Sequence, residues 1–114
     1  MQLSELIKKL EFAVIYEGSD LDAEVTGGYA GDLLSDVIAS GRKGDVWVTI
    51  QVHENIIAVA TLKDLTAIIL AKNSQALDET LESAEEEDVT LLQSPLTAFE
   101  LVAELAALGV SGTR

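Results

Sequence analysis

Short aliphatic runs alternate along this chain with stretches of helical periodicity. The runs lie at residues 12–16, 46–52, 67–71 and 89–92. Because neighbouring parallel strands have to be joined by crossover connections, usually helices, the alternation predicts one α/β domain rather than a helical bundle or a β-sandwich. We therefore expect a three-layer α/β/α sandwich with a mainly parallel sheet of about five short strands.

The length and composition fit one domain with an aliphatic core. A chain of 114 residues can bury a core without cross-links. Apolar residues make up 48% of it and aromatic residues only 4%, which favours layers of Val, Ile, Leu and Ala. Cysteine is absent, and this excludes disulfides, a thiolate nucleophile and cysteine-ligated zinc or iron–sulfur centres.

Acidic residues dominate the charge. Lysine and arginine number 7 against 20 aspartates and glutamates, so the formal net charge is −13. Such a field repels phosphate backbones and anionic lipid surfaces, and we expect binding neither to nucleic acid nor to membranes. A basic partner protein is compatible with it.

The apolar segments are too short to cross a bilayer. Residues 1–10 have the spacing of an amphipathic helix rather than of a signal peptide, and no apolar run is longer than the five residues at 56–60. We therefore expect a soluble, cytoplasmic protein.

The strand predicted at residues 46–52 has two different faces. Its residues alternate, with Val46, Val48, Ile50 and Val52 on one face and Trp47, Thr49 and Gln51 on the other. Since Trp47 shares its face with two polar residues, we favour a partly covered site or a dimer contact for the indole ring. Residues 66–71 show no alternation, as expected for a central strand covered on both faces.

A predicted helix at residues 55–62 is apolar almost all round. A helix with one face in solvent would show a polar side, so this helix is expected to be covered on more than one side. The surplus of apolar surface is our main reason for expecting self-association, with a homodimer as the favoured state.

Glycine and capping signals predict several boundaries. Residues 21–26 are expected to form a second strand that ends at the glycine pair 27–28. Asp32 is expected to cap the next helix, and Gly41 to end it in the left-handed conformation. Ser94-Pro95 is expected to open the last helix.

The carboxyl end of strand 46–52 is the expected functional edge, because ligands of open parallel sheets bind beyond the carboxyl ends of the strands. His53, the only histidine, stands there, and Asn55 can cap the following helix and help to attract an anion. A crevice at this edge is expected to be lined by Gly27, Gly28, Thr49, Gln51, His53 and Asn55. The alternative is that the glycine pair makes only a tight turn and that His53 only packs at a junction.

Motifs of known chemistry are absent from the sequence. There is no GxxxxGK[ST] phosphate loop, no GxGxxG fingerprint, no GxSxG elbow and no HExxH zinc motif. The acidic run at residues 85–88 is most simply the solvated face of a helix. We therefore predict no catalytic residue, no metal site and no cofactor.

Several segments together resemble the DRTGG domain family. The resemblance begins at Glu24-Val25-Thr26-Gly27-Gly28 and covers nearly the whole chain. It continues through Tyr29, residues 32–37 and 44–51, His53, Asn55, residues 58–60, Pro95-Leu96 and residues 99–101. Ala23-Glu24-Val25 stands where the family name has Asp-Arg, so no role of that arginine transfers to this chain.

This resemblance implies an α/β fold similar to the N-terminal domain of HPr kinase/phosphorylase. The family also occurs beside CBS domains in some inorganic pyrophosphatases and in long phosphotransacetylases, and stand-alone members resemble accessory proteins, sometimes encoded near iron–iron hydrogenases. It implies a single DRTGG-like domain at residues 1–110 and a tail at 111–114. The resemblance is to a non-catalytic part only, because the phosphate loop is missing.

Two functional hypotheses follow. The first is a non-enzymatic regulatory or scaffold domain that acts by self-association and by binding a partner protein. The second is a sensor of a small ligand, either a nucleotide or another metabolite, with its crevice at the carboxyl ends of the strands.

Overall fold

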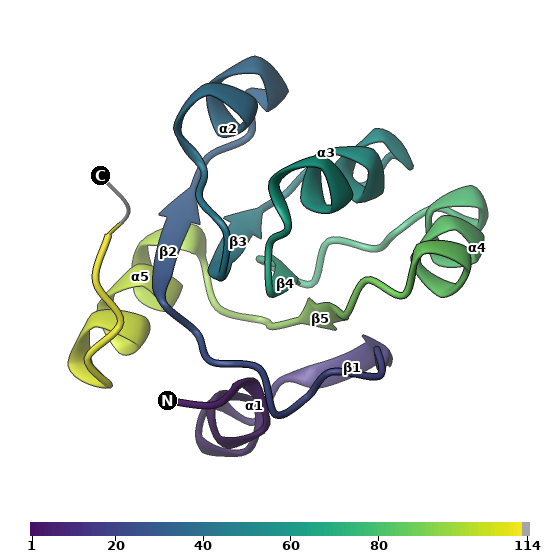
Figure 1. Ribbon diagram of the computed structural model, residues 1–114. Helices are drawn as coiled ribbons and strands as arrows, with labels where there is room; N and C mark the ends of the chain where they lie inside the picture. The colour runs from purple at the N-terminus through teal and green to yellow at the C-terminus, as the bar shows by residue number, and fades with distance from the viewer. Residues whose placement is uncertain (113–114) are drawn as a thin grey trace.

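Helices and strands alternate along the chain in the computed structural model, which describes residues 1–112 (Figure 1). The elements are α1 (Leu3–Leu10), β1 (Ala13–Tyr16), β2 (Gly27–Ala30), α2 (Leu34–Ser40), β3 (Asp45–Thr49), α3 (Asn55–Lys63), β4 (Ala67–Leu70), α4 (Asp78–Glu87), β5 (Leu91–Gln93) and α5 (Ala98–Ala107). The second half of the tail expected at 111–114 lies outside the described residues.

One five-stranded sheet forms the middle of the molecule, in the order β1-β5-β4-β3-β2. The pairs β2–β3, β3–β4 and β4–β5 are parallel, and only β1 runs antiparallel, against β5. Helices cover both faces: α2, α3 and α4 one, α1 and α5 the other (Figure 1). The predicted three-layer, mainly parallel architecture is confirmed.

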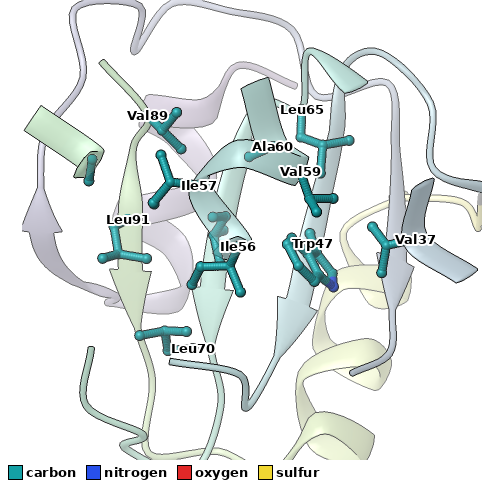
Figure 2. Packing of buried hydrophobic residues seen from close by; sticks show 12 residues of the cluster. Val37, Trp47, Ile56, Ile57, Val59, Ala60, Leu65, Leu70, Val89 and Leu91 are labelled. Carbon is teal, nitrogen blue, oxygen red and sulfur yellow. The ribbon is translucent and has the colours of Figure 1, made fainter. Parts of the chain in front are cut away.

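Two apolar cores lie on either side of the sheet because the side chains of β3 alternate between its faces. Trp47 belongs to the core under α2, α3 and α4 (Figure 2), and Val46 and Val48 belong to the core under α1 and α5. Residues 67–70 of β4 are fully buried, which confirms the central strand inferred from the missing alternation.

The prediction that Trp47 is partly covered or a dimer contact is wrong. Its side chain is fully buried, and the indole N–H donates to the Gly31 carbonyl at 2.8 Å. The polar neighbours on its strand face lie at and beyond the end of β3, whereas Trp47 sits in mid-strand under Val37 and Val59 (Figure 2). Its polar atom is therefore satisfied inside the chain.

The apolar helix α3 is covered on more than one side, as predicted, but by its own chain. It packs on the sheet and lies between α2 and α4 (Figure 1). Ile56, Ile57, Val59 and Ala60 are buried there. Ala58 and Leu62 remain exposed on its outer side. The burial of most apolar side chains of this helix therefore requires no second subunit.

The second strand lies later in the chain than the sequence pattern predicts. Residues 21–26 form no strand; an isolated bridge between Glu24 and Gln2 and several backbone hydrogen bonds to residues 1–4 hold them in place. The strand is β2 at Gly27–Ala30, so the glycine pair opens it instead of ending it. The sequence of β2 has little β propensity of its own, and pairing with the β-branched strand β3 stabilises its extended conformation.

Three predicted boundaries are also wrong. Helix α2 begins after Leu33, without a side-chain cap, because the carboxylate of Asp32 is engaged elsewhere. Gly41 ends this helix at φ −64°, which is not left-handed. Helix α5 starts beyond Ser94-Pro95, where Thr97 and Glu100 form a reciprocal capping box.

None of the helices within residues 1–112 is long and apolar enough to cross a membrane.

Candidate functional site

Asp32 ties together the loops that follow β2 and β3 at the carboxyl edge of the sheet. Its carboxylate accepts hydrogen bonds from the Thr49 hydroxyl at 2.8 Å and from the Ile50 backbone N–H at 2.9 Å. Its carbonyl accepts from the Gln51 side-chain amide at 2.9 Å. The Thr49 hydroxyl also accepts from the Gln51 backbone N–H at 3.2 Å. We call Asp32, Thr49 and Gln51 the edge clasp.

The edge clasp uses two residues that were expected to contact a ligand. Thr49 is buried, and its hydroxyl both donates and accepts within the chain. Such a bond to a carboxylate is charge-assisted and stronger than a neutral one. Thr49 and Gln51 therefore hold the shape of this edge, and Asp32, expected only as a helix cap, is the residue that organises it.

His53 and Asn55 lie beside the edge clasp on the surface. Both are exposed, and they border an open hollow of about 430 Å³ together with Glu54, Leu77 and Glu79. Asn55 is the first residue of α3 and makes no cap, because the N-cap position is Glu54. A histidine flanked by two carboxylates suits a cationic or hydrogen-bonding group better than an anion.

The glycine pair lies at the amino ends of the parallel strands, across the sheet from the carboxyl edge. Gly27 and Gly28 open β2, opposite Asp45 and Val46 at the start of β3. The Gly28 N–H donates to the Ser111 carbonyl at 2.9 Å, and Gly28 forms a parallel bridge with Gly112. The predicted set is therefore divided: Thr49, Gln51, His53 and Asn55 share one edge, and the two glycines lie at the other.

An apolar groove runs beside β2, which is an edge strand of the sheet. We call it the β2 groove; its volume is about 230 Å³. It is lined by Gly28, Tyr29, Ala30, Val48, Val102, Leu105, Ala106, Val110, Ser111 and Gly112. None of these side chains is charged. On α5 next to it, Phe99 is 86% exposed and Val102 45% exposed.

A second polar cluster lies where the turn after β1 meets the end of α4. The carboxylate of Asp88 accepts hydrogen bonds from the hydroxyl and the backbone N–H of Ser19 and from the Tyr16 hydroxyl. The bonds from Ser19, followed by the one from Tyr16, hold the pKa of Asp88 below its ordinary value. The same hydrogen bond to Asp88 raises the pKa of Tyr16.

The acidic residues do not assemble into a metal centre within residues 1–112. No group of three or more histidines, aspartates and glutamates there has an arrangement that could hold a metal ion. Asp20, Glu24, Asp64 and Asp88 border an open hollow of about 620 Å³. Asp64 pairs with Lys43, which also borders it, and Glu24 pairs with the terminal amine of Met1.

Comparison with known proteins gives a structural likeness and no sequence match. No family model matches the chain, and no curated protein matches it. A crystal structure of the CBS and DRTGG domains of the regulatory region of Clostridium perfringens pyrophosphatase, complexed with the activator diadenosine tetraphosphate, superimposes with a TM-score of 0.73 at 12% identity. The likeness covers 90% of this chain and 44% of that one.

This likeness shows the fold. The chain shares its α/β architecture with part of that structure, and it spans less than half of that structure's length. At 12% identity the side chains of a site are not transferable between the two proteins.

Proposed function

We propose that this chain is a non-catalytic regulatory domain of the DRTGG kind, made of residues 1–110 and working in the cytoplasm by binding. The observation that carries the proposal is the fold likeness to a regulatory region over 90% of the chain. The edge clasp supports it, because the polar side chains nearest to the expected crevice are engaged in holding two loops together.

Self-association through the β2 groove is the mode of action that we propose. The groove lies beside the edge strand β2, whose outer side Ser111 and Gly112 meet at Gly28. The rest of such an edge can extend the sheet by pairing with another chain. Exposed Phe99 and Val102 add apolar surface of the kind that marks interfaces. Because the groove lining is uncharged, two copies that each carry a net charge of −13 would place no like charges directly opposite each other here.

The test is the molar mass in solution. Light scattering at high micromolar concentration is expected to give twice the mass of the chain, and Phe99→Glu is expected to give the monomer. Leu62→Glu is the matched control, since Leu62 is 68% exposed on the opposite helical layer. A strict monomer of the unaltered protein would contradict self-association, and a monomer only with Leu62→Glu would contradict the β2 groove.

A ligand-sensing role is the second candidate. It is favoured by the neighbouring structure, which was solved in complex with an activator dinucleotide. The hollow that His53 and Asn55 border is the site predicted from the sequence. A ligand that binds the folded state raises the melting temperature by linkage. Thermal shifts with nucleotides and acyl phosphates, compared between the unaltered protein and His53→Ala, test this candidate. If none of these ligands raises the melting temperature, ligand sensing is contradicted and only the self-association proposal remains.

A further inference from the structure

Three of the cationic side chains of this acidic chain surround one hollow. The hollow is open, has a volume of about 910 Å³ and is lined by Tyr29, Ala39, Ser40, Gly41, Arg42, Lys43, Leu62 and Lys63. The other cationic side chains within residues 1–112 are Lys8, Lys9 and Lys72. No acidic residue is among the lining residues, although acids outnumber bases almost threefold in the chain. We call this the basic hollow.

The fold holds the backbone of the basic hollow firmly in place. Arg42 and Lys43 lie in the turn between α2 and β3, where the Arg42 N–H donates to the buried carboxylate of Asp45 at 2.9 Å. The Lys43 carbonyl accepts from the Thr26 hydroxyl at 3.0 Å. Lys63 is the last residue of α3 and also lines the hollow. The cations are thus carried by ordered backbone, which lowers the entropic cost of binding a ligand.

Two of the three cationic side chains have no ion-pair partner among residues 1–112. Arg42 and Lys63 form no ion pair with any residue of the described chain, and Lys43 pairs with Asp64 at 3.5 Å. In that pair the two side chains are 84% and 71% exposed, so a ligand can displace Asp64 at little cost. Asp36 lies nearby, but its carboxylate accepts a hydrogen bond from the Tyr29 hydroxyl.

The partial negative charges at two helix C-termini limit which anions the basic hollow can bind. Both α2 and α3 end at the basic hollow, and each helix C-terminus carries roughly half a negative charge. Lys63 alone would be explained as compensation for this dipole. The negative helix ends repel any anion. A single carboxylate would reach one cation, whereas a chain of phosphates can contact several cations at once and so offset this repulsion, with Arg42 able to bind two oxygens together.

We propose that the basic hollow binds a small polyphosphate ligand, with Arg42, Lys43 and Lys63 on the phosphates. The volume lies within the range of about 300–1,000 Å³ that is usual for small-molecule sites. The ring of Tyr29 and the exposed Leu62 offer an apolar wall to an organic group attached to the phosphates. The inference rests on the ligand-sensing candidate and gives it a site distinct from the His53 hollow.

The experiment is calorimetric titration at low ionic strength with inorganic tripolyphosphate and, separately, with monophosphate. Tripolyphosphate is expected to bind more tightly than monophosphate and to weaken as salt is added. Arg42→Glu/Lys63→Glu is expected to lower the affinity by about tenfold or more, as loss of hydrogen bonds to charged groups requires. Arg42→Gln/Lys63→Gln serves if the reversed charges impair folding.

Lys8→Glu/Lys9→Glu is the matched control. These residues are exposed in the last turn of α1, on the other face of the sheet, so the pair makes the same change in net charge and also removes cations from a helix end. We expect it to retain tripolyphosphate binding. Equal losses in both double variants, or no binding to the unaltered protein at millimolar tripolyphosphate, would overturn the inference.

The outcomes also separate this inference from the proposals before it. If nucleotides raise the melting temperature but Arg42→Glu/Lys63→Glu leaves the shift unchanged, the basic hollow is not the site and ligand sensing stands. If no nucleotide and no polyphosphate binds, both fail. The molar mass in solution tests self-association independently of either result.

Discussion

Single side chains decide how tightly the turns of this domain are built. Thr26 is an example, because its hydroxyl bonds to the Lys43 carbonyl and its N–H bonds to the Gly44 carbonyl at 3.0 Å. The turn before β3 is therefore pressed against the segment before β2. Gly44 allows this in two ways: it adopts φ +87°, and it leaves room where a Cβ would lie 2.2 Å from Thr26 Oγ1.

Gly44→Ala is expected to destabilise the domain more than Gly109→Ala. Gly109 also has a positive φ, +94°, but a Cβ there would meet nothing within 4 Å. The Gly109 change should cost about 1–2 kcal/mol of unfolding free energy from backbone strain alone. The Gly44 change should cost about 1–3 kcal/mol more, from overpacking against Thr26. Urea denaturation measures both, and equal losses would show that crowding at Gly44 is relieved without cost.

Each element of the fold is fastened to the next by a few polar contacts at its ends. The Asp88 cluster fastens the turn after β1 to the junction of α4 and β5, and Gly18 packs so closely there that its N–H bonds to the Thr90 hydroxyl at 3.1 Å. Thr80 likewise fastens α4 by donating to the Val52 carbonyl at 2.6 Å. Such contacts hold short elements that would be unstable alone.

The contribution of Asp88 is expected to depend on pH. Its pKa is lowered in the folded state, so its stabilising effect is present above its unfolded value, near 3.8, and is lost as pH falls through the folded pKa. The stability difference between the unaltered protein and Asp88→Asn should therefore be largest above that pH and shrink in more acidic solution.

Urea midpoints measured across the acidic range test this dependence. Glu100 also has a lowered pKa, through its hydrogen bonds to Thr97, but it titrates equally in both proteins and cancels in the difference. A difference that stays constant with pH would contradict a role for the Asp88 charge.

Most elements of the sheet could be predicted from the sequence, because β-branched residues mark β3 and β4. The ends of elements could not, since hydrogen bonds from distant residues set them. Strand β3 stops at Thr49 because the Ile50 N–H bonds to Asp32. The start of α5 carried a readable signal, Thr97-x-x-Glu100, but Pro95 competed with it as a helix-opening residue.

The candidate sites were harder to predict than the fold. Placing Gly27 and Gly28 beside Thr49 and Gln51 assumed that the glycines follow a strand, whereas they open one and so lie at the opposite edge. The basic hollow joins Arg42 and Lys63 from different elements, and no spacing along the chain reveals that proximity.

Across the whole molecule, the middle of the sheet is more deeply buried and more fully hydrogen-bonded than the strand β1 at its side. Strand β4 is buried along its full length and paired on both sides. Strand β1 is paired only with β5, is mostly exposed and has an irregular register between Val14 and Tyr16. The two strands are therefore expected to open with different free energies.

Native-state hydrogen exchange tests this gradient. The backbone amides of Ile68 and Ile69 in β4 should exchange only through global unfolding, while those of β1 should exchange faster, through local opening. Urea should accelerate the β4 amides strongly and the β1 amides little. Equal protection in both strands would show that the antiparallel edge folds and unfolds with the whole sheet.

The contact between Ser111 and Gly28 has a practical consequence for anyone who handles this protein. Because Gly112 bridges to Gly28 and lines the β2 groove, a peptide fused directly after Gly112 would begin at this groove. Such a fusion would compete with self-association through the β2 groove. An affinity handle belongs at the amino end, behind a cleavage site, and should be removed before any mass is measured.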